Sequence, residues 1–129
     1  MHGLHLTADL RGCPRPLALL TDATALQSLC VGEVRRAGLQ AVNTLFHRFD
    51  APPGEPAGIT GVVLLAESHL AVHTWPELDA VTLDVYVCNF SADHGAAAEA
   101  LMAALIAAFE PAEVQRHVLR RGTLQPQTA

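Results

Sequence analysis

The central stretch of this chain, residues 62–77, reads VVLLAESHLAVHTWPE. It opens on a short apolar run, and a second run, also rich in β-branched residues, follows over residues 81–87. Short runs of this composition predict strands rather than helices. Between and just beyond them lie a hydroxyl, two imidazoles, a carboxylate and the Cys88 thiol. A few polar groups between apolar walls are typical of a reactive site, because a low dielectric strengthens each charge interaction.

The rest of the chain predicts a mixture of strands and helices. We expect strands over residues 4–10, 41–49 and 114–119, two strands around Ser68, one strand ending at Cys88, helices over 17–37 and 96–109, a turn over 89–93 and a frayed tail over 125–129. Residues 50–58 contain three prolines and two glycines and predict a loop. This order predicts one α+β domain over residues 1–129, a two-layer sandwich whose antiparallel-rich sheet carries two helices on one face.

Composition narrows the possible functions. The net charge of -5 argues against a nucleic-acid partner, and no apolar run approaches the roughly 20 residues of a membrane span. The mean hydropathy of +0.26 indicates a buried interface. With no export signal at the N-terminus, we expect a cytoplasmic protein whose Cys13, Cys30 and Cys88 are free thiols. Because the chain has no glycine-rich phosphate loop, an enzyme here would make its own cofactor or use none.

The order of motifs resembles the bacterial S-adenosylmethionine decarboxylase proenzymes. The shared pattern is GVV, ESH and H-T-x-P-E, followed by an apolar strand that ends in cysteine, over residues 61–88. The resemblance extends over roughly residues 3–122, with a further motif at residues 46–49. It implies a homodimer that pairs two sheets into a four-layer αββα assembly.

Ser68 carries the central chemical prediction. By itself it indicates only a serine in a turn between strands. The resemblance implies that its hydroxyl attacks the carbonyl of Glu67, converting the amide to an ester, and that elimination and hydrolysis then leave a pyruvoyl group. This reaction cuts the chain into a β chain, residues 1–67, and an α chain, residues 68–129. The pyruvoyl cofactor forms a Schiff base with a substrate amine and withdraws electrons as carbon dioxide leaves.

The resemblance implies roles for five further residues. Thr60 supplies a hydroxyl that assists processing, in place of the usual serine, and His73 accepts the α-proton of the serine during elimination. Cys88 donates a proton after decarboxylation. Glu77 binds the ribose diol, and Phe49 stacks on adenine. Four of them also have a structural interpretation: Thr60 as an ordinary strand threonine, His73 as a histidine bonded to the backbone, and Cys88 and Phe49 as packing residues.

Three departures from the family pattern bear on the substrate. The loop after Phe49 is longer and rich in proline, and residues 89–90 replace a usual glycine. Arg11 stands where an aromatic residue is common, and its guanidinium could hold a substrate carboxylate. We therefore expect a small-molecule substrate, either S-adenosylmethionine in spermidine biosynthesis or, alternatively, ornithine or arginine.

Other classes of function remain as alternatives. His69 and His73, with Glu77 or Cys88, offer ligand types suited to a metal, but a helix would be needed to pair the two histidines; we therefore predict no metal. A cysteine hydrolase built on Cys88 lacks a visible orienting group. A non-catalytic dimeric α+β module is the remaining alternative, and it predicts an uncut chain.

Overall fold

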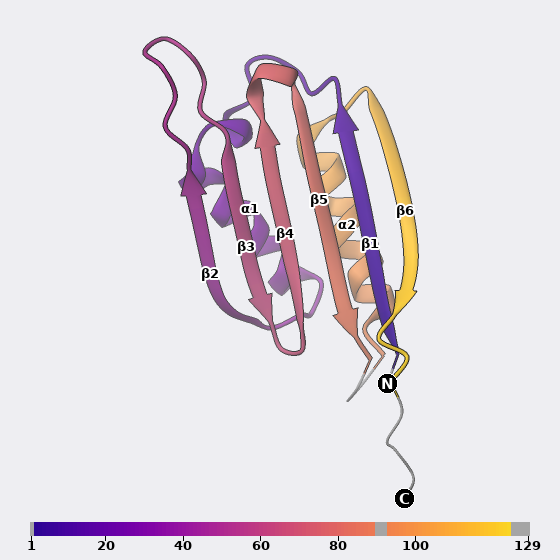
Figure 1. Ribbon diagram of the computed structural model, residues 1–129. Helices are drawn as coiled ribbons and strands as arrows, with labels where there is room; N and C mark the ends of the chain where they lie inside the picture. Colours follow the sequence, from indigo (N-terminus) through magenta and orange to yellow (C-terminus); the bar gives the residue numbers. More distant parts are fainter. Residues whose placement is uncertain (1, 90–92, 125–129) are drawn as a thin grey trace, which may run out of the picture.

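The computed structural model describes residues 2–89 and 93–124, and within them six strands form one sheet (Figure 1). The strands are β1 (Gly3–Arg11), β2 (Ala41–Arg48), β3 (Ile59–Leu65), β4 (Ser68–Trp75), β5 (Ala80–Cys88) and β6 (Glu113–Arg121). Their order is β2-β3-β4-β5-β1-β6, and every neighbouring pair is antiparallel. The helices α1 (Ala23–Arg36) and α2 (Gly95–Phe109) lie against one face. The expected α+β sandwich with two helices on one face is confirmed.

The core lies between the helices and the sheet, and the sequence pattern explains why. In β4, Leu70 and Val72 are buried and alternate with half-buried His69, Ala71 and His73, as expected for a strand with one covered face. The helices contribute residues spaced by four, among them Leu26, Cys30 and Val34 from α1 and Leu101, Leu105 and Phe109 from α2. None of the described helices is long and apolar enough to cross a membrane.

The sheet face opposite the helices, called the open face below, is uncovered in the single chain. It carries the side chains of His69, Ala71 and His73 from β4 and their cross-strand partners. Four large apolar side chains on this face are 42–71% exposed, namely Leu45, Leu64, Trp75 and Leu119. These side chains are spread over β2, β3, β4 and β6, and their exposure favours burial of this face against another surface.

The first helix begins later than its periodicity predicted. Residues Ala18–Leu20 form a separate 3-10 turn, and α1 starts at Ala23. Asp22 sets this start, because its side chain accepts a hydrogen bond from the backbone N–H of Ala25 at 3.1 Å, which is an N-cap. The prediction of one helix over residues 17–37 was therefore wrong at its beginning. The predicted turn at 89–93 lies partly, and the tail at 125–129 wholly, outside the described residues.

Candidate active site

Ser68 begins β4 directly after a strained residue. A two-residue turn joins β3 to β4, with Leu65 paired with Ser68 across it. Glu67 in this turn has φ 66°, in the left-handed region, which costs a residue with a Cβ on the order of 1–2 kcal/mol. The peptide bond predicted to break is therefore the bond that follows this strained residue.

Cys88 lies beside Ser68 at the same end of the sheet. The two belong to neighbouring antiparallel strands, and the backbone N–H of Cys88 donates to Ser68 Oγ at 3.1 Å. Cys88 itself is buried, with 5% of its surface exposed. The structure thus brings together Ser68, from which the resemblance derives the pyruvoyl group, and Cys88, which the resemblance makes the proton donor after decarboxylation.

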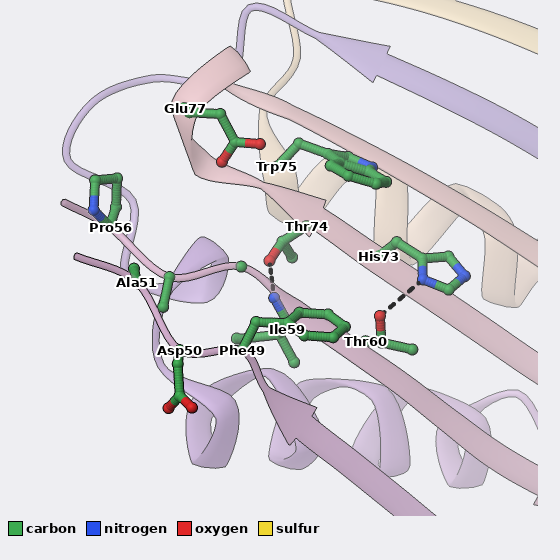
Figure 2. Close-up of a pocket in the computed structure, with 12 residues that line it drawn as sticks. Phe49, Asp50, Ala51, Pro56, Ile59, Thr60, His73, Thr74, Trp75 and Glu77 are labelled. Atoms are coloured by element: carbon green, nitrogen blue, oxygen red, sulfur yellow. Dashed lines mark hydrogen bonds between the residues drawn. The ribbon is translucent and has the colours of Figure 1, made fainter.

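Thr60 and His73 form a second group, further along the sheet. They are directly opposite each other on β3 and β4, and Thr60 Oγ1 lies 3.1 Å from His73 Nδ1 (Figure 2). Both are on the open face and only half-buried. A hydroxyl bonded to an imidazole is an arrangement that can accept and pass on a proton.

The same region holds a cavity lined by Phe49, Thr60, His73, Trp75 and Glu77 (Figure 2). Its volume is about 210 Å³, which is below the roughly 300–1,000 Å³ of typical small-molecule sites. This cavity is therefore too small to enclose such a ligand by itself. The predicted binding residues Phe49 and Glu77 do share this cavity.

Trp75 was missed by the sequence reasoning. Its indole lines the cavity with Phe49, and its Nε1–H donates to Thr82 Oγ1 at 3.3 Å, so the ring is oriented. It is 42% exposed, unusual for a residue of this size, in the middle of the motif H-T-W-P-E. That position was the available signal. Arg11 lies apart from the cavity, in a neighbouring groove that also contains Trp75.

The two groups do not meet within one chain. His73 is five residues after Ser68 on the same strand, and at about 3.3 Å per residue this is a separation of about 16 Å. His73 cannot remove a proton from Ser68 of its own chain across that distance. The simple expectation of a neighbouring imidazole is therefore not met inside the monomer.

The same spacing argues against the alternative metal site built on His69 and His73. His69 and His73 are four residues apart on a strand, about 13 Å along the chain. A single ion cannot bind both. His69 instead lies with His5 and Asp84, a different cluster.

The other two cysteines are not placed for chemistry. Cys13, Cys30 and Cys88 are all free and buried. Burial raises the pKa of the Cys30 thiol to about 12. Burial, and then the charge of Asp79, raise the pKa of Cys13. Both therefore stay protonated and unreactive at neutral pH.

A sheet that holds a serine beside a cysteine at one end, and a paired histidine and threonine with an aromatic cavity on its open face, is an arrangement suited to an α+β enzyme. The family model for S-adenosylmethionine decarboxylase matches residues 4–122. The S-adenosylmethionine decarboxylase proenzyme of Moorella thermoacetica is 32% identical over 98% of this chain and 93% of its own length. That of Persephonella marina is 35% identical over 95% and 84%.

A solved structure agrees with the sequence comparisons. The crystal structure of the adenosylmethionine decarboxylase from Aquifex aeolicus VF5 matches with a TM-score of 0.81 and 32% identity, over 98% of this chain and 96% of that chain. The chain belongs to the S-adenosylmethionine decarboxylase family, which is a family of enzymes. The predicted membership is confirmed.

Proposed function

We propose that this protein is a pyruvoyl-dependent decarboxylase of S-adenosylmethionine that makes its own cofactor from Ser68. The observation that carries the proposal is the strained Glu67 immediately before Ser68, together with the hydrogen bond that the backbone N–H of Cys88 donates to Ser68 Oγ. Family membership supports the same activity. The product would supply the aminopropyl group for spermidine biosynthesis.

Self-cleavage uses groups that the chain itself provides. Ser68 Oγ attacks the carbonyl carbon of Glu67, the C–N bond breaks, and an ester replaces the amide. Loss of the serine α-proton then breaks the Cβ–O bond, which frees Glu67 as a carboxylate. The residue that remains is a dehydroalanine. Water adds to it, ammonia leaves, and the α chain then begins with a pyruvoyl group. The release of strain at Glu67 favours the first step.

Within the mature site, each residue has a distinct task. A pyruvoyl carbonyl supplies an electron sink for the charge left when carbon dioxide departs. Cys88 can place a proton on the former α-carbon. Phe49 and Trp75 offer two aromatic faces that suit adenine or a sulfonium cation, and Glu77 can accept hydrogen bonds from a ribose.

We also propose that the active enzyme is a homodimer joined through the open face. Ser68 and His73 are about 16 Å apart on one strand by its rise per residue. In a two-fold dimer that stacks the open faces, His73 and Thr60 of the partner subunit can reach the Ser68 end of the first chain. The exposed apolar side chains on this face, Leu45, Leu64, Trp75 and Leu119, support such burial. The partner would also complete the small cavity.

S-adenosylmethionine is favoured over ornithine or arginine by the two aromatic side chains in the cavity. A linear basic amino acid has no planar ring for Phe49 and Trp75 to stack upon. Arg11 supports the alternative only weakly, because it lies in the neighbouring groove.

The test is a denaturing mass spectrum followed by a substrate assay. We expect two fragments, residues 1–67 and 68–129, with a carbonyl at the start of the second. Released carbon dioxide should appear with S-adenosylmethionine and not with ornithine or arginine. An intact chain after long incubation would favour the non-catalytic module, and carbon dioxide from ornithine or arginine would favour the alternative substrate.

A further inference from the structure

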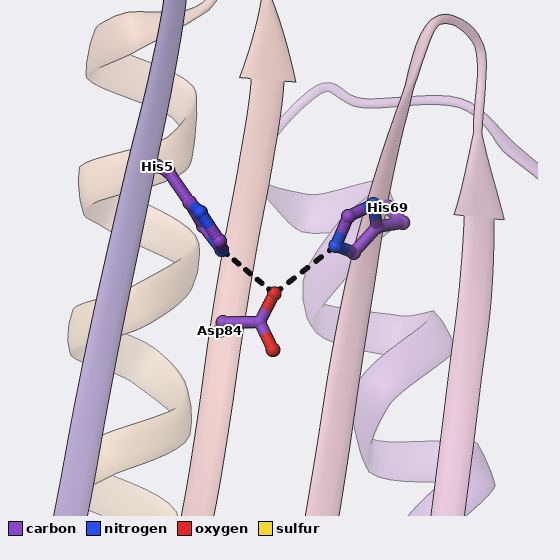
Figure 3. A group of neighbouring side chains, drawn as sticks. All are labelled: His5, His69 and Asp84. Carbon is purple, nitrogen blue, oxygen red and sulfur yellow. Dashed lines mark hydrogen bonds and ion pairs between the residues drawn. The ribbon is translucent and has the colours of Figure 1, made fainter. Parts of the chain in front are cut away.

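A polar network crosses three strands of the open face. Asp84 of β5 lies between His5 of β1 and His69 of β4 (Figure 3). Its Oδ2 is 2.9 Å from His5 Nε2 and 3.0 Å from His69 Nε2. The side chains are only 18%, 26% and 35% exposed for His5, Asp84 and His69. Partial burial means that water does not fully weaken these bonds.

Arg121 contacts the far side of His5 in this network. Its Nη1 lies 3.2 Å from His5 Nδ1, and its guanidinium carbon lies 4.3 Å from the centre of the Tyr86 ring. Because a guanidinium only donates, His5 Nδ1 accepts, and the proton of a neutral His5 is on Nε2, facing Asp84. A metal ion would need a lone pair on that same Nε2. The ligand atoms of His5, His69 and Asp84 lie within 4.8 Å of one another, and in this structure both histidines are hydrogen-bonded to Asp84.

His69 connects this network to the predicted cleavage site, because it directly follows Ser68. Ser68 follows the strained Glu67 and precedes His69. The His69 side chain is hydrogen-bonded to Asp84 of β5, which is also hydrogen-bonded to His5 of β1. After cleavage, β4 would begin with a free end, no longer joined to β3. Chain ends fray unless they are tied down.

We propose that Asp84 is a positioning residue for self-cleavage, acting through His5 and His69, and that it afterwards holds the new end of the α chain in register. This inference rests on the proposed function, because it needs a cut at Ser68. It does not require Asp84 to touch the reacting atoms. The carboxylate is the shared acceptor, so its removal releases both histidines.

The experiment compares wild type with Asp84→Ala, Asp84→Asn and His5→Ala. The control is Glu99→Gln, which removes another carboxylate from an ion pair, with Arg116 at 2.8 Å. Each protein is made by cell-free synthesis, and the fraction cut is followed in time. Hydrogen exchange is then measured over residues 68–73 and over α2.

We expect Asp84→Ala to be cut about 10- to 100-fold more slowly, the range for losing bonds to a charged acceptor. Asp84→Asn keeps one acceptor oxygen and should be intermediate. Exchange should rise over residues 68–73 and stay unchanged in α2, which a general loss of stability would not produce. Glu99→Gln should match wild type.

Wild-type cleavage and exchange in all three network variants would overturn the proposal and leave the proposed function intact. If Asp84→Ala does not fold, Asp84→Asn and His5→Ala decide by the same two measurements. If wild type is never cut, the proposed function fails. In that case exchange over residues 68–73 of the uncut variants still shows whether Asp84 holds the start of β4.

Discussion

The two ends of β4 differ in what they contain. At its beginning, Ser68 and His69 are hydrogen-bonded to β5, Ser68 Oγ to the backbone N–H of Cys88 and His69 Nε2 to the carboxylate of Asp84. Towards its end, His73 pairs with Thr60, and Trp75 lines an open aromatic cavity. The first end holds groups suited to breaking bonds, and the second holds groups suited to binding a ring and moving a proton. Because a strand is extended, neither end can complete the other within one chain.

Ser68→Ala tests the first end and should have the largest effect. Without a hydroxyl no ester can form, so the chain should remain a single band on a denaturing gel and release no carbon dioxide. Ser28→Ala, an exposed serine of α1, should be cut normally. Cleavage of Ser68→Ala at the same peptide bond would rule out the serine mechanism.

Cys88→Ala should separate cleavage from turnover. The contact with Ser68 comes from the backbone N–H of Cys88, so the substitution leaves it in place and cleavage should proceed. Decarboxylation should slow by about 10²–10⁴-fold, the usual effect of removing a general acid. Activity should also fall with successive turnovers, because misplaced protonation would turn the cofactor into alanine. Full and lasting activity would show that Cys88 only packs.

Trp75→Ala tests the second end. Loss of one aromatic face should raise KM for S-adenosylmethionine about fivefold, from about 1 kcal/mol of stacking. Self-cleavage should be unaffected, because the indole takes no part in ester formation or in the loss of the serine α-proton. Trp75→Phe should restore most of the affinity, and Leu78→Ala, an exposed neighbour, is the control. An unchanged KM would remove Trp75 from the binding site.

The smallest effect is expected at Cys30. Its pKa is raised to about 12 by burial, so at pH 7–9 almost no thiolate exists to react. Iodoacetamide should leave Cys30 unmodified in the native protein over this range, and modify it once the protein is unfolded. Peptide mapping by mass spectrometry measures this. Rapid native labelling of Cys30 would contradict its buried position between α1 and the sheet.

Much of the fold followed from local pattern. Apolar residues that alternate within residues 62–88 predicted the strands and their covered face. Apolar residues spaced by about four predicted the two helices. The predicted start of α1 was wrong, because the apolar spacing continues through residues 17–20 while the Asp22 N-cap decides where the helix begins.

The site was less predictable, since it depends on which strands are neighbours. The motif gave Ser68, and the strand pairing that sets Cys88 beside it came from the structure. His5 and Asp84 are 79 residues apart, and only the insertion of β1 next to β5 brings them together. No local pattern encodes such a contact.

The central claim, that the two ends of β4 act together only across a dimer, can be tested by mixing variants. Ser68→Ala and His73→Ala are first produced separately, and each alone should be largely uncut. Co-expressed with different tags, they should form mixed dimers in which the intact Ser68 of one chain meets the intact His73 of the partner subunit. We predict that the His73→Ala chain is then cut and the Ser68→Ala chain is not. If native mass spectrometry shows mixed dimers and the His73→Ala chain still remains whole, the shared site is contradicted.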